Sequence, residues 1–410
     1  MARRSVIGVV AVAAAMLTVL AACSGSSGGK STNSGSSANA PGGQPLRVGF
    51  VNMEGGAVSL PEVRLGAEIG ADYVNTKLGG VRGRPLTYLR CDVDGSPERS
   101  IDCANKMVEA KVPLVRLGVD VSSDAMLPIL TSAGIPLVGH IAFGPQQLTS
   151  PHAFFLGIPT TAGALAPLKH YADAGKKSVA FVVADVPGVR VLPLLLAPYA
   201  ASYGVNPTVS FYDQTRPDWN VLVTKAMASK PDVIGVPLAT ENDCTAFITA
   251  AQAAGFRGEL FAGSCSTFMS ALGPKGAGVV TLFDRWRPEA LADAPPAKQT
   301  ELRIFLDAAS AAGKTKQAVG LAPATFADTV DLARILSTIT GRIDGPAVES
   351  AIKATKNVDG FLGPSLTCDG SIWKGQNGCS SSVVFYQAQA DGTMRALGKD
   401  FVDVSTLTGG

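Results

Sequence analysis

The sequence predicts an α/β protein built from doubly wound parallel sheets in two lobes. Short apolar runs typical of strands alternate with segments of helical spacing along most of the chain. Strands that alternate with helices form parallel sheets covered on both faces. The chain also has 410 residues, which is more than one hydrophobic core normally organises. Two lobes, each with its own sheet, are therefore expected.

The expected elements follow one another from residue 46 onward. The first strand is expected at Leu46–Val51, and the helix after it at Pro61–Lys77, with proline at a tolerated N-terminal position. Further strands are expected at Leu86–Leu89, Pro113–Leu117, Ile135–Val138, Ser178–Val183, Thr208–Phe211, Val233–Val236, Leu260–Ala262 and Val279–Phe283. Helices between them include Glu98–Ala110, Ala162–Ala174, Trp219–Ser229 and Asp243–Ala254. Residues Lys298–Lys356 are expected to be mainly helical, and Cys368–Gln387 to form a hairpin.

Residues 1–22 are expected to be an export signal. Arg3 and Arg4 precede an apolar run from Val6 to Leu20, which is short for a membrane-spanning helix of about 20 apolar residues. The tetrapeptide Leu20-Ala21-Ala22-Cys23 resembles a bacterial lipobox, in which the cysteine becomes the lipidated first residue of the mature chain. The alternative is an uncleaved signal anchor with a chance cysteine, which the short apolar run disfavours.

Residues 23–45 are expected to form a lipidated tether. Ser, Gly, Asn, Ala, Thr and Pro make up nearly all of this segment, so it cannot bury a core. The whole chain has 35 basic and 33 acidic residues, and without Arg3 and Arg4 the counts are 33 and 33. A neutral mature chain without a Lys/Arg cluster makes nucleic acid an unexpected partner.

One stretch and several shorter ones carry a resemblance to a known family. Residues Asn75–Leu86 contain a pair of glycines suited to a left-handed helix cap, a further turn glycine, and a proline before the next strand. This stretch closely resembles the signature that ends the first helix of type I periplasmic binding proteins of the branched-chain amino acid class. Further matches follow in order at Asp94–Arg99, Ala133–Val138, Pro217–Trp219, Lys230–Val233 and Ala254–Phe256.

The resemblance implies both architecture and function. Lobe 1 would contain residues 46–162 and 286–360, lobe 2 would contain residues 163–285 and 361–410, and hinge crossovers would join them. The family holds a small-molecule ligand in the cleft between the lobes and delivers it to an ABC permease. The resemblance therefore implies a monomeric solute-binding lipoprotein of an ABC importer, anchored by lipid at the extracytoplasmic face of the cell membrane, with no cofactor.

The seven cysteines fit this compartment. Cys23 accounts for the odd one, and six cysteines permit 15 pairings. The implied fold favours the local pairs Cys91–Cys103, Cys244–Cys265 and Cys368–Cys379, because each pair stays inside one lobe. A zinc site is the alternative, but no Cys-x-x-Cys occurs and the three histidines have no ligand-like spacing to a cysteine. No metal is expected.

Motifs for catalysis are incomplete. No Gly-x-Ser-x-Gly nucleophile elbow is present, and Gly313-Lys314-Thr315 imitates a P-loop without its first glycine or a preceding strand. His140 alone among the histidines follows an apolar strand, where it could face a cleft. We therefore do not expect an enzyme; a cell-envelope enzyme is the remote alternative, and a ligand-sensing lipoprotein of the same fold is the nearer one.

Ligand contacts are expected beyond the carboxyl ends of the strands. Ser122 and Ser123 resemble the family's hydroxyl pair at a helix start, although either could be a plain N-cap. Ala142 and Phe143 match the segment that supplies a backbone carbonyl and a hydroxyl, and Phe143 or Gly144 stands in place of the hydroxyl. Phe143 could stack on the ligand or simply fill the lobe. Asp185 matches an acidic position of the second lobe. Trp286, near the return crossover, could wall the cleft or pack at the hinge. The remaining candidates are Ser59, Asp120 and Thr240.

Two departures from the family pattern change the expected ligand. Cys265 stands where a glutamate is expected to help hold an α-amino group, and Val186-Pro187-Gly188 replaces a Tyr-Gly pair. A buried ammonium needs paired acceptors, so these changes should weaken amino acid binding. A small carboxylate, an aromatic acid or another apolar metabolite fits as well as leucine, isoleucine or valine.

Overall fold

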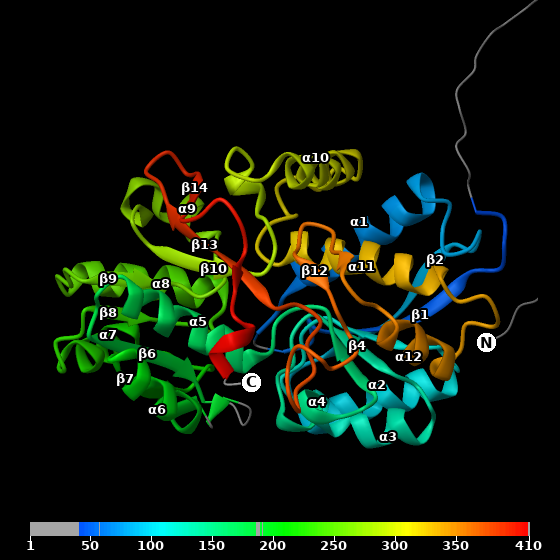
Figure 1. Cartoon of the computed structure of the whole chain (residues 1–410), viewed down its shortest axis with the longest axis horizontal. Helices are drawn as coiled ribbons and strands as arrows, with labels where there is room; N and C mark the ends of the chain where they lie inside the picture. Colours follow the sequence, from blue (N-terminus) through cyan, green and yellow to red (C-terminus); the bar gives the residue numbers. More distant parts are fainter. Residues whose placement is uncertain (1–40, 57, 186–188, 191, 409–410) are drawn as a thin grey trace, which may run out of the picture. The chain divides into compact units, whose positions relative to one another are not determined.

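Two β-sheets, each flanked by helices, organise the chain in the computed structural model (Figure 1). The structure describes residues 41–56, 58–185, 189–190 and 192–408. The predicted signal peptide, Cys23 and the tether up to residue 40 lie outside the described residues.

The first sheet is wholly parallel, with strand order β2-β1-β3-β4-β5. Its strands are β1 (Leu46–Met53), β2 (Leu86–Val93), β3 (Val115–Leu117), β4 (Leu137–Gly139) and β5 (Ala153–Phe155). The helices between them are α1 (Pro61–Lys77), α2 (Pro97–Glu109), α3 (Leu127–Ser132) and α4 (Pro145–Thr149). Three later helices return to this part of the molecule: α10 (Pro296–Ala311), α11 (Ala322–Ser337) and α12 (Gly345–Lys353).

The second sheet combines a parallel body with an antiparallel edge, in the order β14-β13-β10-β9-β8-β6-β7. Its parallel strands are β6 (Ser178–Ala184), β7 (Asn206–Tyr212), β8 (Val233–Gly235), β9 (Glu259–Phe261) and β10 (Val280–Phe283). Antiparallel pairing adds β13 (Ser382–Ala388), β14 (Met394–Ala396) and β15 (Val402–Asp403). The helices of this part are α5 (Thr160–Asp173), α6 (Leu192–Tyr203), α7 (Trp219–Met227), α8 (Glu241–Ala253) and α9 (Phe268–Leu272).

Three described segments cross between the two sheets. The first runs from β5 to α5, the second from β10 to α10, and the third from α12 to β13 through the short pair β11 (Val358–Asp359) and β12 (Ser365–Leu366). Hydrogen bonds join the segments: the guanidinium of Arg285 donates to the Leu156 carbonyl, and the Trp286 amide donates to the Leu362 carbonyl at 2.7 Å. The predicted fold class, two parallel-sheet lobes joined by crossovers, is confirmed.

The glycine-rich signature after α1 has the expected backbone. Gly79, Gly80 and Gly83 have φ values of 75°, 73° and 75°, in the left-handed region that glycine enters without a Cβ penalty. A Cβ at Gly80 would also collide with the carbonyl of Arg84. The predicted helix cap and turn are confirmed.

Some predicted elements are wrong or were missed. No hairpin spans Cys368–Gln387, because residues 368–381 form an irregular loop closed by a disulfide and anchored by the buried Trp373. The hairpin of this region instead pairs β13 with β14. Neither β5 nor α6 was expected; β5 is only three residues long, and α6 contains an internal proline.

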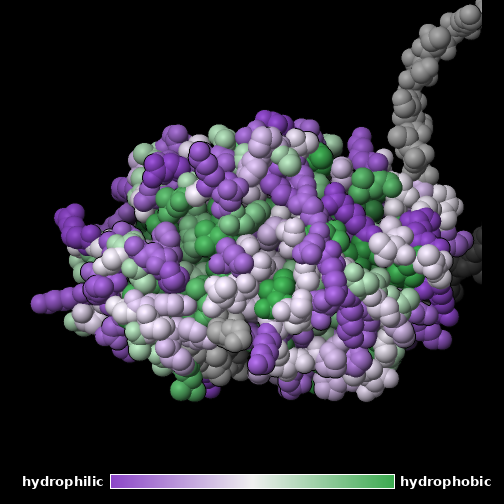
Figure 2. All heavy atoms as spheres, in the orientation of Figure 1, coloured by the Kyte–Doolittle hydropathy of each residue, from purple (hydrophilic) through white to green (hydrophobic). Residues whose placement is uncertain are grey.

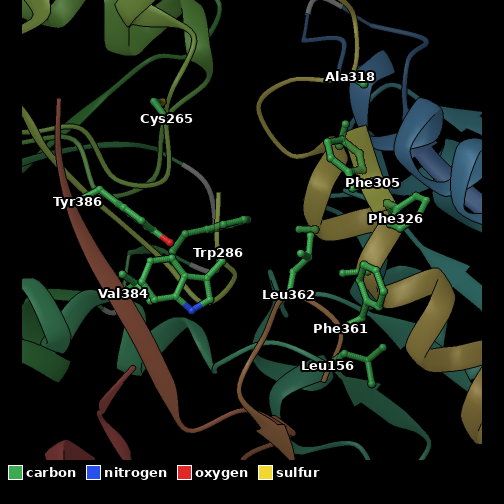
Figure 3. Packing of buried hydrophobic residues seen from close by; sticks show 14 of the residues in the cluster. Leu156, Cys265, Trp286, Phe305, Ala318, Phe326, Phe361, Leu362, Val384 and Tyr386 are labelled. Carbon is green, nitrogen blue, oxygen red and sulfur yellow. The ribbon is translucent and has the colours of Figure 1, made fainter. Parts of the chain in front are cut away.

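Aromatic side chains fill the cores on both sides of the crossovers (Figure 3). Phe326 lies 5.3 Å from Phe305 and 5.6 Å from Phe361 between ring centroids. The Trp286 ring is fully buried and packs edge-on against Tyr386 at 6.1 Å. The second crossover is therefore anchored in packed core rather than running over the surface.

The three predicted disulfides, Cys91–Cys103, Cys244–Cys265 and Cys368–Cys379, are present. Each closes a loop inside one part of the fold, which limits the unfolded chain. Among the described residues, no group of three His, Cys, Asp or Glu side chains is arranged to hold a metal ion.

The described surface has scattered apolar side chains. Figure 2 shows hydrophobic residues in separate patches among hydrophilic ones on the viewed face. Within the described ranges, no helix is both long enough and apolar enough to cross a membrane.

Close packing of α1 against α11 predicts that Gly66→Ala destabilises the fold. A Cβ at Gly66 would collide with the Ala322 carbonyl and the Thr325 hydroxyl, so we expect a loss of about 1–3 kcal/mol in the free energy of unfolding. Gly163→Ala is the control, because its Cβ would meet only the Ile158 Cδ1 atom at 3.7 Å, and alanine is the better helix former. Chemical denaturation of both variants measures the effect; equal stability of the two would contradict the packing argument.

Candidate functional site

A cavity of about 250 Å³ lies where the carboxyl ends of strands from both sheets meet. The first sheet contributes Gly118 and Val119 after β3, and His140 after β4. The second contributes Ser264 after β9 and Asp284 after β10. This edge is where ligands bind in open α/β sheets.

The cavity walls are mainly apolar. Both halves of the fold supply aliphatic side chains, and Phe143 and Phe283 add two aromatic rings. The aliphatic side chains on the walls are those of Met53, Val58, Leu60, Val63, Val119, Val121, Ile141, Leu148, Ile158, Val189, Leu192, Leu238, Leu282 and Leu321. The walls therefore favour a ligand with an apolar body.

Five helices begin at the cavity, one of them α6, whose first residue Leu192 lines it. Residues of the first turn or two of α1, α5, α8 and α11 line it, among them Val63, Thr161, Glu241 and Thr325. The N-terminus of a helix carries a partial positive charge and unpaired backbone N–H groups. Their convergence favours an anionic group inside the cavity.

Most polar side chains on the walls are already hydrogen-bonded within the protein. Thr160 donates to the Ala142 carbonyl, Thr161 donates to the Gln376 amide oxygen at 2.6 Å, and Thr240 donates to Asp243 at 2.8 Å. Among the described wall residues, the side chains of Glu62, Gln214 and Ser264 have no hydrogen bond to another residue of the protein. Few polar groups are therefore free to bind a ligand.

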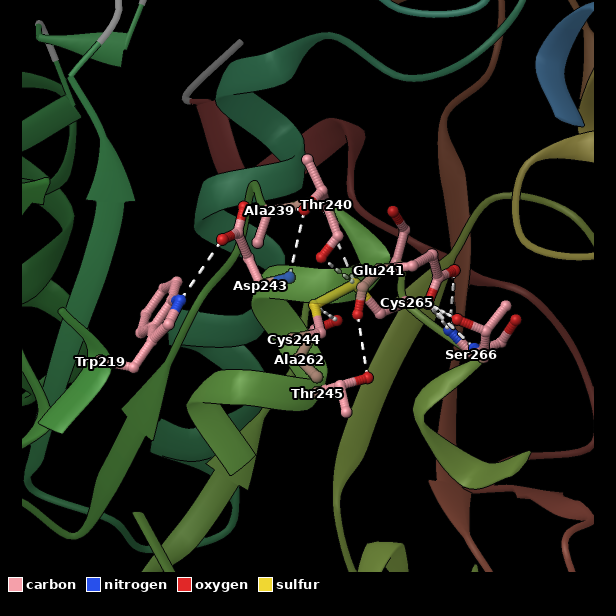
Figure 4. The surroundings of a disulfide bond; sticks show 12 residues. Trp219, Ala239, Thr240, Glu241, Asp243, Cys244, Thr245, Ala262, Cys265 and Ser266 are labelled. Carbon is pink, nitrogen blue, oxygen red and sulfur yellow. Dashed lines mark hydrogen bonds between the residues drawn. A yellow bond between two sulfur atoms is a disulfide. The ribbon is translucent and has the colours of Figure 1, made fainter. Parts of the chain in front are cut away.

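The loop after β9 is held against α8 by two devices (Figure 4). Cys265 forms a disulfide with Cys244, and the Glu241 carboxylate accepts hydrogen bonds from the backbone amides of Ser266 and Thr267 at 2.9–3.1 Å. Cys265 and Glu241 both line the cavity. The wall at this position is thus fixed by covalent and charge-assisted bonds, and the Glu241 carboxylate is committed to the loop.

A buried ionic cluster forms the cavity floor. The imidazole of His140 contacts Asp284 through Nε2 at 3.1 Å and Asp328 through Nδ1 at 3.2 Å. Burial alone would lower the pKa of His140, but the two carboxylates outweigh it and raise the pKa to about 9. His140 is thus an imidazolium at neutral pH, with both ring nitrogens engaged by acidic partners.

Two buried arginines complete this cluster. Arg116 binds Asp328 at 2.7 Å, and Arg285 binds Asp328 at 3.1 Å and lies 3.5 Å from Asp284. Burial opposes ionisation of the two carboxyl groups, but the cationic partners lower the pKa of both below the usual range. Burial raises the pKa of nearby Asp331 to about 7, and its carboxylate accepts the Phe361 amide at 2.9 and 3.0 Å.

Some of the predicted site residues lie at the cavity or next to it. Phe143 and Thr240 line the cavity, as does Cys265, which departs from the family pattern. Ser59 lines an adjoining groove of about 610 Å³ that shares Leu60, Glu62, Thr240 and Glu241 with the cavity.

Three predicted residues after β3 do not line the cavity in this structure. Asp120 is fully buried, and its carboxylate accepts the Ser100 hydroxyl at 2.6 Å and the Ser122 amide at 2.9 Å. The Ser122 hydroxyl donates to the Gly95 carbonyl, and that of Ser123 donates to the Asp120 carbonyl. Neither hydroxyl caps the following 3-10 helix through its side chain, and their role in binding stays a prediction.

Three more predicted residues lie away from the cavity wall. Ala142 is buried, and its carbonyl accepts the Thr160 hydroxyl. Asp185 is exposed and paired with Arg190 at 2.5 Å. Trp286 was a candidate for the cleft wall or for hinge packing, and its indole is buried against Tyr386 and Phe401, because the second crossover inserts it into the core.

Sequence reasoning missed most of the ionic cluster. Arg116 and Asp328 are 212 positions apart, and nothing in the local pattern of either one signals the other. Phe283 and Asp284 stand at the end of an expected strand, so the rule that selected residues after strand ends could have selected them. Glu62, at the start of α1, was missed as well.

The pKa of His140 predicts a pH-dependent stability. The folded-state pKa of about 9 exceeds the usual value of 6.5, so the stabilisation is complete below about pH 6.5 and is lost as pH rises to 9. We expect the stability advantage of the wild type over His140→Gln to fall by roughly 1–3 kcal/mol between pH 7 and 9. Urea denaturation at several pH values measures this.

His170→Gln is the control for that series. Burial lowers the pKa of His170, so its titration lies below the tested range and its removal should leave the slope between pH 7 and 9 unchanged. Parallel stability profiles for the wild type and His140→Gln would contradict the assignment of His140 as a buried imidazolium.

Comparisons with solved structures agree with the fold. A substrate-binding protein of an ABC transporter from Aeropyrum pernix matches with a TM-score of 0.75 at 17% identity, covering 89% of this chain and 99% of that one. A leucine-binding protein from Thermotoga maritima matches with a TM-score of 0.71 at 15% identity, covering 87% and 99%. A solute-binding protein from Rhodopseudomonas palustris, solved with 4-hydroxybenzoate, matches with a TM-score of 0.71 at 17% identity, covering 88% and 96%.

Curated proteins give no match. The family model described as periplasmic binding protein matches residues 45–393, a span that includes the first sheet, the second sheet as far as β13, the three crossovers and the cavity. The chain therefore belongs to the periplasmic binding protein family.

Proposed function

We propose that the protein is an extracytoplasmic solute-binding lipoprotein of an ABC importer. Its ligand is a small molecule with an apolar body and a carboxylate, of the aromatic or branched aliphatic acid type. The observation that carries the proposal is the mainly apolar cavity of about 250 Å³ at the converging strand ends. Ligand pockets measure about 300–1,000 Å³, so the ligand is at the small end of the range.

The carboxylate is inferred from the electrostatics of the walls. Five helices point their N-termini at the cavity, and the field of each favours negative charge. The ionic cluster at the floor has three cations, Arg116, His140 and Arg285, against the two carboxylates of Asp284 and Asp328. The floor and the helix N-termini favour an anion, against the opposing charge of Glu62 and Glu241 on the walls.

An α-amino group finds little support in the same walls. A buried ammonium needs acceptors. The Asp284 carboxylate is already ion-paired with His140 and Arg285 and accepts the Ile158 amide, although its Oδ1 has no hydrogen bond. The Glu241 carboxylate is bound by the loop after β9. Glu62 is the remaining wall carboxylate in the described part of the chain, and burial raises its pKa. An acid without an amino group therefore fits better than an amino acid.

Ligand capture would proceed by closure of the lobes. Phe143 comes from the part built on the first sheet, and Leu238 and Ser264 come from the part built on the second. A ligand that touches both parts stabilises the arrangement in which both are in contact with it, and the population shifts accordingly. The closed form would then be presented to the membrane permease as a monomer.

Attachment to the membrane would depend on Cys23. The N-terminal apolar run and the lipobox-like Leu20-Ala21-Ala22-Cys23 support cleavage after residue 22 and lipidation of the cysteine. The Ser/Gly-rich tether would then hold the binding domain clear of the membrane. Binding and delivery, rather than catalysis, is the activity that this organisation supports.

A ligand screen by thermal unfolding tests the proposed ligand class. We expect aromatic and branched aliphatic carboxylates at millimolar concentration to raise Tm, because a ligand at 100 times its Kd adds about 2.7 kcal/mol to the stability of the folded state. Phe143→Ala should weaken binding of the best acid about tenfold or more, because it removes an aromatic wall. Phe256→Ala is the matched control: it removes a half-buried ring that lines neither the cavity nor the groove, and it should bind as the wild type does.

Two outcomes would contradict the proposal. The first is stabilisation by leucine, isoleucine or valine but by none of the acids. The second is loss of acid binding in Ser122→Ala with full binding in Phe143→Ala, which would move the ligand out of the apolar cavity.

A further inference from the structure

Arg287 is a buried cation without an ionic partner. Its side chain is about 1% exposed, and no carboxylate of the described residues lies within ion-pairing distance of it. The guanidinium donates one hydrogen bond, to the Ser264 carbonyl, and its Nε has no partner. Arg116 and Arg285, the other buried arginines near the cavity, are both paired with acidic residues.

Arg287 lies directly behind two residues that line the cavity. Its guanidinium carbon lies 4.4 Å from the centroid of the Phe283 ring, which is cation–π geometry. Phe283 lines the cavity, and so does Ser264, whose carbonyl accepts the hydrogen bond from Arg287. The charge therefore lies one aromatic ring behind the cavity wall.

The neighbouring charges do not neutralise Arg287. Arg285, two positions earlier, is engaged by Asp284 and Asp328. Glu289, two positions later, forms no ion pair, and its buried Oε2 has no hydrogen-bond partner. A buried charge is costly unless an opposite charge compensates it, and the described residues supply no carboxylate within ion-pairing distance of Arg287.

We infer that Arg287 is a specificity-determining residue that makes the cavity select anionic ligands, and that the anionic group of the ligand is its counter-charge. Arg287 acts through Phe283 and the Ser264 carbonyl rather than by touching the ligand, so it is a positioning residue. This role rests on the proposed capture of a small apolar acid, and it assigns the discrimination against neutral analogues to Arg287. The Arg287 charge is itself buried, so water screens it less than it would a surface charge.

Matched acid and amide pairs test this inference. The probes are 4-hydroxybenzoate and 4-hydroxybenzamide, phenylacetate and phenylacetamide, and 4-methylpentanoate and 4-methylpentanamide, titrated at pH 7.5 by isothermal calorimetry. The members of each pair have nearly the same shape and differ in charge. We expect the wild type to prefer the acid of its best pair by about tenfold or more, and Arg287→Met to reduce this preference to about threefold or less while still binding the amide.

Two further variants separate charge from structure. Arg287→Lys keeps the charge and should keep most of the preference, which provides a folded comparison if the methionine variant is unstable. Arg334→Met removes a partly exposed arginine that lies 5.5 Å from the Phe361 ring and lines neither the cavity nor the groove. It should leave both affinities unchanged.

The possible failures are distinguishable. If the wild type prefers acids and Arg287→Met keeps the full preference, the role of Arg287 is wrong and the proposed function stands. If the wild type binds amides as tightly as acids, the proposed carboxylate ligand is wrong and the inference falls with it. A loss of preference in Arg287→Lys equal to that in Arg287→Met also overturns the role of its charge. If no acid and no amide binds the wild type, the proposed ligand class is wrong and the inference falls with it.

Discussion

Asp328 is the residue on which the junction of the two sheets depends. Its buried carboxylate lies 2.7 Å from Arg116 on β3, 3.1 Å from Arg285 on the second crossover, and 3.2 Å from His140 at the end of β4. Removing one member of such a buried cluster leaves an uncompensated charge and typically costs about 3–5 kcal/mol. Arg285 also holds the first crossover through the Leu156 carbonyl. One carboxylate thus connects strand ends and crossovers that are far apart in the sequence.

The same cluster determines the chemistry of the cavity. His140 and Asp284 line the cavity but form an ion pair with each other. The floor therefore acts on a ligand mainly through its electrostatic field and less through direct hydrogen bonds. The walls above it are aliphatic and aromatic, and the helix N-termini supply the remaining polarity. The similar Thermotoga maritima protein is named a leucine-binding protein. One fold can hold different ligands, and we propose that the walls of this cavity suit an acid without an amino group better than an amino acid.

The fold was largely predictable from the sequence, and the site only in part. Short stretches of sequence were enough to predict the alternating strands and helices, the glycine cap after α1 and the local cysteine pairs, because each depends on residues close together in the chain. The loop between Cys368 and Cys379 was misread as a hairpin, since its turn residues and apolar side chains resemble one. Phe143 and Thr240 could be found from strand ends, whereas Arg116 and Asp328 are joined only by tertiary structure. Whether Trp286 walls the cleft or packs at the hinge could not be decided from the sequence, because spacing does not show on which side of a crossover a side chain is buried.

The central claim is that the apolar cavity holds an anionic organic molecule between its aromatic walls. A crystal structure of the protein with the tightest-binding carboxylate tests this most directly. We expect the ligand to contact Phe143 and Phe283, with its carboxylate directed toward the N-terminus of α5 and no cationic group on Glu62. A ligand held by the Ser122 and Ser123 hydroxyls outside this cavity, or one bound through an ammonium group on Glu62, would contradict the central claim.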